Sequence, residues 1–347
     1  MANSRQTLAG VGVGHYGASV PRCAAPLSQG KSPMNLASTL RVRTRRVALV
    51  AVTAASVVTL GASVAAAAPS PTPKATAHHT TKQGPLGTLT AVPSAGARTS
   101  DVAIPTTCAG IVHRTVNGNL DRYIYRGERF TRVPLGTLSF DGVVQTPKTL
   151  ALAVQTEEFD VFFAILNDGS LWRVTGDNSG LHSEQLSARG WGGVRHITAS
   201  PTGTRLYALT NDGGLYRYAI TSALGIKSMG ALATSGWGAV KFLSPLPADN
   251  TYDAFVGVIS TTGGVNEYLT DRAAGTVSST RLFASGWGTM RHLSVGSCSD
   301  SLAVPIIGFN SSNNAYAYYD TNVFNSSGAD WRSAGQVGSG FSGLLSD

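Results

Sequence analysis

Residues 190–197 read GWGGVRHI, and close copies follow as GWGAVKFL at 236–243 and GWGTMRHL at 286–293. A second phrase recurs with the same period, as NDGSLWR at 167–173, NDGGLYR at 211–217 and TGGVNEY at 262–268. Fainter versions of it are NGNLDR at 117–122 and NNAY at 313–316. Self-similarity at a fixed spacing of about 45 to 50 residues is typical of repeat architectures. The five copies of the second phrase therefore indicate five units.

Each unit carries the local signals of β-strands joined by tight turns. In the best-formed unit, RLYAL at 205–209 and LYRY at 215–218 flank an Asn-Asp-Gly-Gly turn. Asp-Gly between runs of apolar and aromatic residues is a strong hairpin signal. Successive hairpins repeated at this period are typical of propeller blades, which are small four-stranded sheets. We therefore expect an all-β, five-bladed β-propeller of antiparallel blades over residues 104–347.

The two ends of this region indicate how the ring closes. The C-terminal GFSGLL at 340–345 imitates the Gly-Trp-Gly phrase and the strand after it, whereas the N-terminal copy lacks that phrase. A C-terminal strand that joins the first blade would remove the open sheet edges. Cys108 in the first blade and Cys298 in the last are neighbours only if the ring closes, which predicts a disulfide across the seam. The alternative is two unrelated buried thiols.

The positive charge of the chain is concentrated outside the repeats. The formal net charge is +8, yet residues 1–100 contain ten basic and no acidic residues. Residues 101–347 then hold 17 basic and 19 acidic residues, a net charge of −2. Binding to phosphates requires clustered Lys and Arg on the folded surface. We therefore expect no nucleic-acid partner.

The N-terminal hundred residues have the layout of an export signal and a linker. Basic residues at 41–46 precede an uncharged apolar run and a small-residue Ala-Ala-Ala stretch, which favours a signal peptide at 34–67 and a secreted protein without stable membrane insertion after cleavage. The alternative is a membrane anchor at 47–68. Residues 1–33 resemble no export segment and are expected either to lie upstream of a true start at Met34 or to be disordered. Residues 68–103 read as a disordered Pro/Thr/Ala-rich tether.

The best-formed unit resembles a known repeat. GWGGVRHI at 190–197, PTGTRLYAL at 201–209 and GGLYR at 213–217 are similar to the repeat of the tachylectin-type lectin propellers. The resemblance implies a five-bladed ring that binds N-acetylated hexosamines of cell-surface or cell-wall glycans, with no cofactor and no catalysis. We expect such a chain to act as a monomer. The fourth unit has an insertion at 245–250 and the fifth lacks the Asp-Gly turn, so two or three sugar sites are expected.

The repeated residues supply the candidate sugar-binding side chains, because aromatic faces accept the C–H side of a pyranose and polar groups bind its hydroxyls. The candidates are Trp191, Trp237, Trp287, Asp168, Asp212, Tyr216 and Arg217. Each type also has a structural alternative. The tryptophans could be wedges between blades, the aspartates could stabilise hairpin turns, and the arginines could be edge-strand charges.

Two other functional classes remain open, a glycan hydrolase on a propeller scaffold and a protein-binding propeller. No nucleophile elbow, zinc spacing or phosphate loop is present, so no catalytic residue and no metal ligand is predicted. The acidic Glu157, Glu158 and Asp160 are expected in a solvated loop without the facing carboxylate that a glycosidase needs. His196 and His292 share one repeat position with Phe242, which favours packing on inner strands over metal binding.

Overall fold

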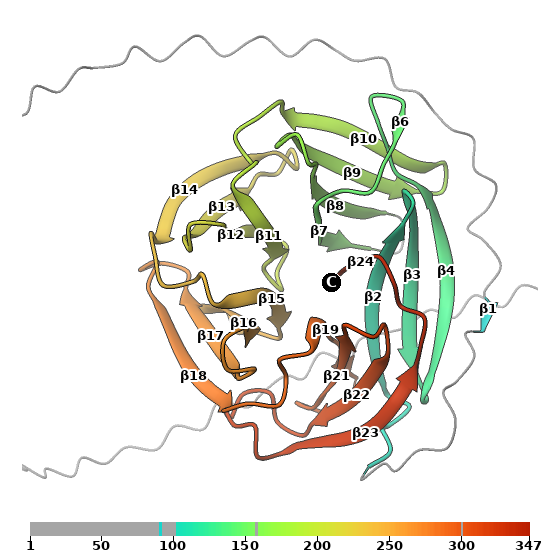
Figure 1. The fold of residues 1–347 in the computed structure, drawn as a ribbon, viewed down its shortest axis with the longest axis vertical. Helices are drawn as coiled ribbons and strands as arrows, with labels where there is room; N and C mark the ends of the chain where they lie inside the picture. The colour runs from blue at the N-terminus through green and yellow to red at the C-terminus, as the bar shows by residue number, and fades with distance from the viewer. Residues whose placement is uncertain (1–89, 92–101, 157–158, 300) are drawn as a thin grey trace, which may run out of the picture. The chain divides into compact units, whose positions relative to one another are not determined.

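The computed structural model describes residues 90–91, 102–156, 159–299 and 301–347. The expected upstream segment and signal peptide, together with most of the tether, lie outside these described residues. Every regular element in the described part is a β-strand. No helix there is long and apolar enough to cross a membrane. Apart from one two-stranded hairpin, the described strands form five small sheets arranged around one axis, so the expected five-bladed β-propeller is confirmed (Figure 1).

Four blades are regular four-stranded antiparallel sheets. Blade 2 consists of β7 (Thr149–Gln155), β8 (Asp160–Ile165), β9 (Leu171–Asp177) and β10 (Gly180–Ser187). Blade 3 consists of β11 (Val194–Ala199), β12 (Arg205–Thr210), β13 (Leu215–Ile220) and β14 (Ile226–Ala233). Blade 4 consists of β15 (Val240–Leu246), β16 (Tyr252–Ile259), β17 (Val265–Asp271) and β18 (Val277–Phe283). Blade 5 consists of β19 (Met290–Val295), β21 (Val304–Asn310), β22 (Ala315–Asp320) and β23 (Trp331–Gly338).

Blade 1 is the one in which the two ends of the ring meet. Its main strands are β2 (Cys108–Val116), β3 (Asn119–Arg126) and β4 (Arg129–Thr137), with the short β1 (Thr90–Ala91) on the outer edge of β4. The C-terminal β24 (Leu344–Ser346) pairs antiparallel with β2, as Figure 1 shows where the red strand meets the teal one. The predicted closure of the ring by the C-terminus is therefore confirmed.

A second closure lies at the other end of β2. There the short β20 (Ser297–Cys298) pairs with β2 so that Cys108 and Cys298 are opposite each other. The two cysteines form the predicted disulfide. A small hairpin that the repeats do not predict, β5 (Ser139–Phe140) and β6 (Val143–Val144), connects blade 1 to blade 2.

Burial follows the position of each strand in its blade. All six residues of β8 are buried, and β12, β16 and β21 are nearly as fully enclosed, because neighbouring blades cover both faces of these second strands. Their sequences are correspondingly apolar on successive residues rather than alternating. The outer strands β14 and β18 are mostly exposed.

The core is divided among the blade boundaries. The buried hydrophobic side chains form five clusters, one at each boundary between adjacent blades. Each blade is therefore stabilised by its two neighbours. This explains why the ring must close, since an open end would expose one such cluster to water.

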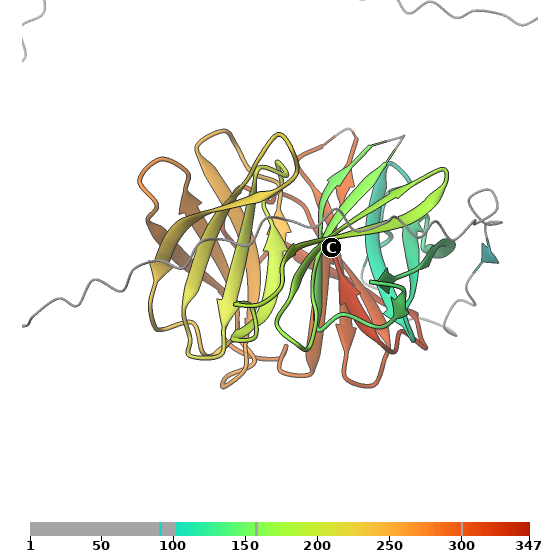
Figure 2. The ribbon, with the colours of Figure 1, turned by 90° about the horizontal axis from the view of Figure 1, so that it is seen from above.

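The strands run between the two faces of the ring, which Figure 2 shows from the side. One face, here called the turn face, carries the hairpins between second and third strands and the Gly-Trp-Gly segments. The opposite face, here called the loop face, carries the hairpins between third and fourth strands. These hairpins are residues 127–128, 178–179, 221–225, 272–276 and 321–330.

Candidate functional site

The three Gly-Trp-Gly segments pack directly on the hairpin turns of the second phrase. The backbone N–H groups of Trp191, Trp237 and Trp287 donate hydrogen bonds to glycine carbonyl oxygens at 3.0, 2.9 and 2.8 Å. In the first case the acceptor is Gly169, whose φ is +80°. A Cβ at Gly169 would lie 2.7 Å from the nitrogen of Gly192, so this turn requires glycine. Both phrases of the repeat thus form one packed structural unit.

The rings of these tryptophans are inserted between blades. Each ring packs on a tyrosine of the next blade's third strand, with ring centroids 4.5 to 4.7 Å apart. The pairs are Trp191–Tyr218, Trp237–Tyr268 and Trp287–Tyr318. Each tryptophan is only 8% exposed. The structure therefore places all three rings between blades, as expected for structural wedges. Direct contact of these rings with a sugar stays a prediction.

The two aspartates of the second phrase have local hydrogen-bond partners. Oδ1 of Asp168 accepts hydrogen bonds from the backbone N–H and the hydroxyl of Ser170, at 2.9 and 2.6 Å. Asp212 accepts hydrogen bonds from the Thr210 hydroxyl and the Gly214 N–H. The hydroxyl donor in each pair contributes most to holding the pKa of the carboxyl below its usual value. Both aspartates thus stabilise hairpins on the turn face, and a contact of either with sugar stays a prediction.

Arg217 lies far from those aspartates, at the boundary of blades 3 and 4. It is 7% exposed, and its Nη1 donates hydrogen bonds to the carbonyl oxygens of Asp271 and Arg272 at 3.3 and 3.2 Å. Tyr216 is half-buried and packs against the cluster between blades 2 and 3. The seven sequence candidates are therefore not gathered into one site, because they fall on both sides of their strands and on different boundaries.

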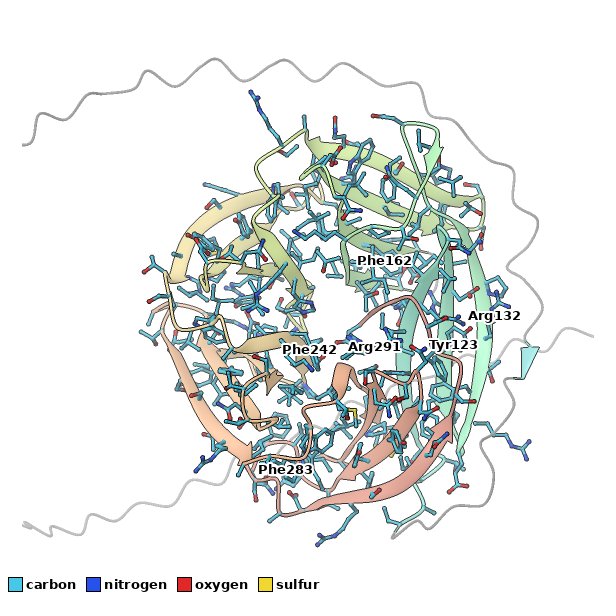
Figure 3. All side chains as sticks on the ribbon, viewed as in Figure 1. Tyr123, Arg132, Phe162, Phe242, Phe283 and Arg291 are labelled. Atoms are coloured by element: carbon cyan, nitrogen blue, oxygen red, sulfur yellow. A yellow bond between two sulfur atoms is a disulfide. The ribbon has the colours of Figure 1, made fainter. Side chains whose placement is uncertain are left out.

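The basic residues of the inner strands also cross the boundaries between blades. Arg195 donates hydrogen bonds to the carbonyl oxygens of Thr210, Lys241 and Trp237 at 3.1, 3.1 and 2.7 Å. The Lys241 ammonium donates to Gly288 and Met290 in the same way. Arg291 reaches the closing segment, and Figure 3 shows it with Phe242 at the inner side of the ring. These cations satisfy backbone carbonyls of the next blade.

The histidines of the inner strands pack near the axis. Nε2 of His196 lies 2.9 Å from the carbonyl oxygen of Leu243, and Nε2 of His292 lies 3.0 Å from Oδ1 of Asp347. Burial lowers the pKa of His196 to about 4 and that of His113 to about 3. Among the described residues, no group of three or more His, Cys, Asp or Glu side chains is arranged to hold a metal ion.

Of the acidic group near residue 160, residues 157–158 lie outside the described part of the chain. Asp160 differs from the expected solvated loop residue. It begins β8, is 5% exposed and pairs with Arg122 of blade 1. This carboxylate therefore stabilises the boundary of blades 1 and 2, where the repeat supplies no Trp wedge.

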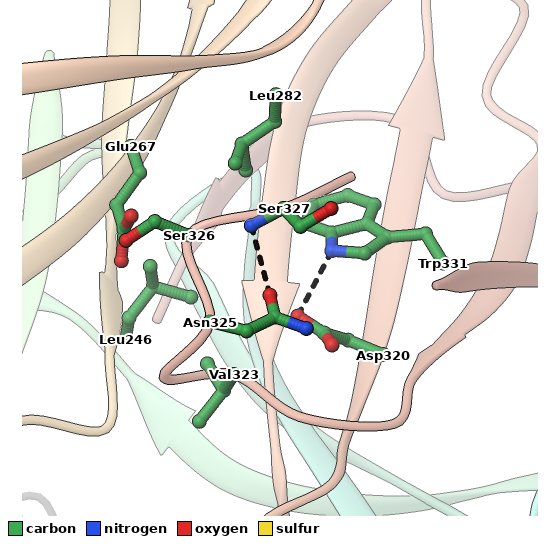
Figure 4. A pocket seen from close by; sticks show the side chains of 9 residues that line it. All are labelled: Leu246, Glu267, Leu282, Asp320, Val323, Asn325, Ser326, Ser327 and Trp331. Atoms are coloured by element: carbon green, nitrogen blue, oxygen red, sulfur yellow. Dashed lines mark hydrogen bonds between the residues drawn. The ribbon is translucent and has the colours of Figure 1, made fainter. Parts of the chain in front are cut away.

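A recess on the loop face combines buried carboxylates with polar groups (Figure 4). It lies between blades 4 and 5, is partly open to solvent, and has a free volume of about 10 Å³, enough for a group the size of one water molecule. We call it the blade 4/5 recess, and its lining residues are Leu246, Glu267, Leu282, Asp320, Val323, Asn325, Ser326, Ser327 and Trp331.

The outer wall of the recess is the hairpin 321–330, the longest of the five on the loop face. Gly328 holds this hairpin against blade 4, since a Cβ there would lie 2.6 Å from the carbonyl oxygen of Leu282. The Asn325 side chain accepts a hydrogen bond from the N–H of Ser327 at 2.8 Å. These contacts fix the shape of the recess in the folded chain.

Two carboxylates line the recess in different ways. Asp320 accepts hydrogen bonds from the indole Nε1 of Trp331 at 2.9 Å and from the N–H of Asn322 at 3.0 Å. Burial nevertheless raises the pKa of Asp320 to about 6, with a further contribution from the nearby Asp330. Glu267 is 4% exposed, and its Oε2 has no hydrogen-bond partner. Burial raises the pKa of Glu267, against a smaller opposing effect of the Ser326 hydroxyl.

Sequence reasoning missed these recess residues although two signals were available. Aligning the second phrases places Glu267 where the preceding units have Arg173 and Arg217. The 321–330 segment is also longer than the matching segment of any other unit. Neither signal shows that Glu267 and the 321–330 segment lie side by side, because they belong to different repeats.

Comparisons with solved structures return lectin propellers of low similarity. A SapL1 lectin bound to α-methyl fucoside has a TM-score of 0.43 and 14% identity, covering 70% of this chain and 85% of that one. The six-bladed lectin of Aleuria aurantia has a TM-score of 0.43 and 12% identity, covering 68% and 77%. No curated protein matches the sequence.

A family comparison is more specific. The family model named Tachylectin matches residues 139–346, which span blades 2 to 5 and the closing C-terminal strand. The matched region includes all three Gly-Trp-Gly wedges and the blade 4/5 recess. This match covers more than half of the chain, and the protein belongs to the tachylectin family.

Proposed function

We propose that this protein is a secreted lectin that binds N-acetylated hexosamines on cell-surface or cell-wall glycans. The observation that carries the proposal is the tachylectin family match over four of the five blades. The implied activity is binding by a rigid, preformed ring, with no cofactor and no chemical step. A monomer is sufficient for multivalent binding, because repeated sites on one ring raise the apparent affinity for a surface that presents many sugars.

Secretion is supported by two independent features. The sequence before the ring has the layout of an export signal. The disulfide between Cys108 and Cys298 is typical of proteins that mature in an oxidising compartment. A mature protein that stays in the reducing cytoplasm would contradict this part of the proposal.

A glycan array with the purified chain tests the binding proposal directly. We expect signals on glycans that contain N-acetylated hexosamines and none on matched glycans without an acetamido group or amine. Absence of signal on every N-acetylated sugar and cell-wall fragment would refute the proposal. A folded Trp191→Ala variant that keeps its binding would limit Trp191 to the wedge role that its contact with Tyr218 supports.

One observation favours the glycan-hydrolase alternative enough to include it in the same experiment. Glu267 and Asp320 line one recess, and a carboxyl of raised pKa beside a second carboxylate is what glycoside hydrolysis uses. Incubating the chain with N-acetylated oligosaccharides and measuring new reducing ends separates the two functions. The lectin proposal expects no release of reducing ends above that from heat-denatured chain.

A further inference from the structure

The blade 4/5 recess occurs where the repeat pattern changes the sign of one charge. The third residues of β9, β13, β17 and β22 occupy equivalent positions in blades 2 to 5, and they are Arg173, Arg217, Glu267 and Ala317. NGNLDR in blade 1 places Arg122 at the same point. Three of the five boundaries thus receive a guanidinium from this position, and the boundary of blades 4 and 5 receives a carboxylate.

At the arginine-bearing boundaries the guanidinium reaches into the next blade. Arg173 donates a hydrogen bond to the carbonyl oxygen of Ala223 at 2.6 Å, in the loop-face hairpin 221–225. Arg217 donates to the carbonyl oxygens of Asp271 and Arg272, at the start of the hairpin 272–276. A positive group with several N–H donors thus fills this place between the third strand of one blade and the hairpin of the next.

At the boundary of blades 4 and 5 the equivalent position holds the Glu267 carboxylate, which accepts hydrogen bonds, instead of a guanidinium, which donates them. Glu267 points toward Ser326 of the hairpin 321–330, as Figure 4 shows. Its Oε2 is buried without a hydrogen-bond partner, which costs free energy unless a ligand or water donates to it. Asp320 and the nearby Asp330 add negative charge, and none of the nine lining residues is basic.

We propose that the blade 4/5 recess binds the protonated amine of a hexosamine that lacks its acetyl group, with Glu267 as the carboxylate that receives the ammonium. An ammonium offers three donors and a compact positive charge, which matches the unpartnered carboxylate oxygen. The inference rests on the proposed lectin function, and it adds a ligand class that differs from the N-acetylated sugars by one acetyl group. An acetamido group is uncharged and offers a single N–H donor, so it gains less from a buried carboxylate than an ammonium does.

The surroundings of Glu267 fit a sugar amine. Ser326 and Ser327 add hydroxyl groups to the lining of the recess, and the Asn325 amide is held in place by the N–H of Ser327 and by the Asp330 carboxylate. Asn325 is exposed, whereas Ser326 and Ser327 are half-buried, so the recess opens on the side of this hairpin. Phe324 in the same hairpin is 53% exposed and offers an apolar surface beside these polar groups.

Calorimetric titration of the purified chain with glucosamine oligomers and N-acetylglucosamine oligomers of equal length tests the inference. An adjacent ammonium favours the ionised form of a carboxyl group, so at about pH 7 we expect the glucosamine oligomer to bind on the order of tenfold more tightly, as one charge-assisted hydrogen bond would provide. Glu267→Gln keeps the shape and removes the charge, and Glu267→Arg introduces the residue type of blades 1 to 3. Both variants are expected to abolish the preference for the amine.

The matched control is Asp177→Asn in β9 of blade 2, which makes the same acid-to-amide change away from the recess. Asp177 accepts hydrogen bonds from the N–H and hydroxyl of Ser179, and asparagine keeps an acceptor there. This variant is expected to retain the preference for the amine. Thermal melting of all variants verifies that each is folded. If the Glu267→Gln chain fails to fold, the Glu267→Arg variant still tests the inference.

Four results would overturn the inference. One is equal binding of both oligomers, which would leave the proposed lectin function intact. Another is a preference for the amine that survives in both Glu267 variants. The third is Glu267-dependent binding of a lysine oligomer that is tighter than binding of the glucosamine oligomer, which would identify a basic protein partner instead. Failure of both sugars to bind would refute the inference, and a blank glycan array would then separately refute the lectin function.

Discussion

Replacing Cys108 and Cys298 together by alanine is expected to lower the free energy of unfolding by about 5 kcal/mol while the folded ring stays closed. The two cysteines are 190 residues apart in sequence, and they link β2 of blade 1 to β20, the short strand after β19 of blade 5. Blades 2, 3 and 4 lie entirely inside this covalent loop, together with most of blade 1 and the first strand of blade 5. Its removal therefore frees a very long segment of the unfolded chain.

The magnitude follows from the entropy of closing that loop. For a loop of about 190 residues the chain-entropy relation gives a stabilisation of about 5 kcal/mol at 25 °C. Domains of ordinary stability unfold at about 5 to 15 kcal/mol, so the change is a large fraction of the total. The folded state should change little, because β24 still pairs with β2 and Arg291 still binds the closing segment.

Equilibrium unfolding in urea, followed by circular dichroism, measures this loss. We expect a lower midpoint, together with a larger dependence of the unfolding free energy on urea, since the unfolded chain without the crosslink exposes more surface. Wild-type chain in excess reductant should match the double variant, and reductant should leave the double variant unchanged. A loss below about 1 kcal/mol would refute the entropic reasoning. Loss of the native near-ultraviolet spectrum would show instead that the disulfide is needed to close the ring.

Two further outcomes follow from the boundaries between blades. Trp237→Ala should destabilise the ring by about 3 to 5 kcal/mol, since it removes a large buried ring that packs on Tyr268, whereas Trp237→Phe should cost less than half as much. Urea melts of both variants measure this, and a loss under about 1 kcal/mol for the alanine variant would contradict the wedge role. His196 has a folded pKa of about 4, below its unfolded value, so its stabilisation is present above about pH 6.5 and is lost as pH falls toward 4. His196→Phe, which copies Phe242, should weaken this acid dependence of the urea midpoint, and an unchanged slope would contradict the assignment.

Much of the fold can be predicted from the sequence because its regular features are local and repeated. The Asn-Asp-Gly turns and apolar second strands indicate hairpins, and their period indicates blades. Closure by the C-terminus and the pairing of Cys108 with Cys298 follow once five units are counted, and the structure confirms both. The hairpin of β5 and β6 and the short β20 could not be predicted, because each occurs once and has no counterpart in the repeats.

The candidate site was harder to predict for a related physical reason. The residues that recur most clearly are those that serve a structural role shared by several blades. Trp191 and Asp168 are examples, the first filling a gap between blades and the second stabilising a turn. Recurrence therefore drew attention to residues whose visible contacts are structural. Glu267 belongs to the weakest of the three long phrases, and its partner hairpin lies some sixty residues further along the chain.

A propeller with identical boundaries would offer identical, well-packed surfaces, and each side chain in them would have a partner within the ring. A buried group that the ring leaves without a partner therefore arises where one blade departs from the others. The boundary of blades 4 and 5 departs twice, through a carboxylate at an arginine position and through an extended hairpin that leans over it. The carboxylate alone would be a buried charge without a ligand. The extended hairpin alone would be a loop with no charged group beneath it. Together they create an enclosed acceptor of hydrogen bonds that is open to solvent on one side. The nearly neutral net charge of residues 101–347 conceals this feature, because Glu267, Asp320 and Asp330 are only three of its 19 acidic residues.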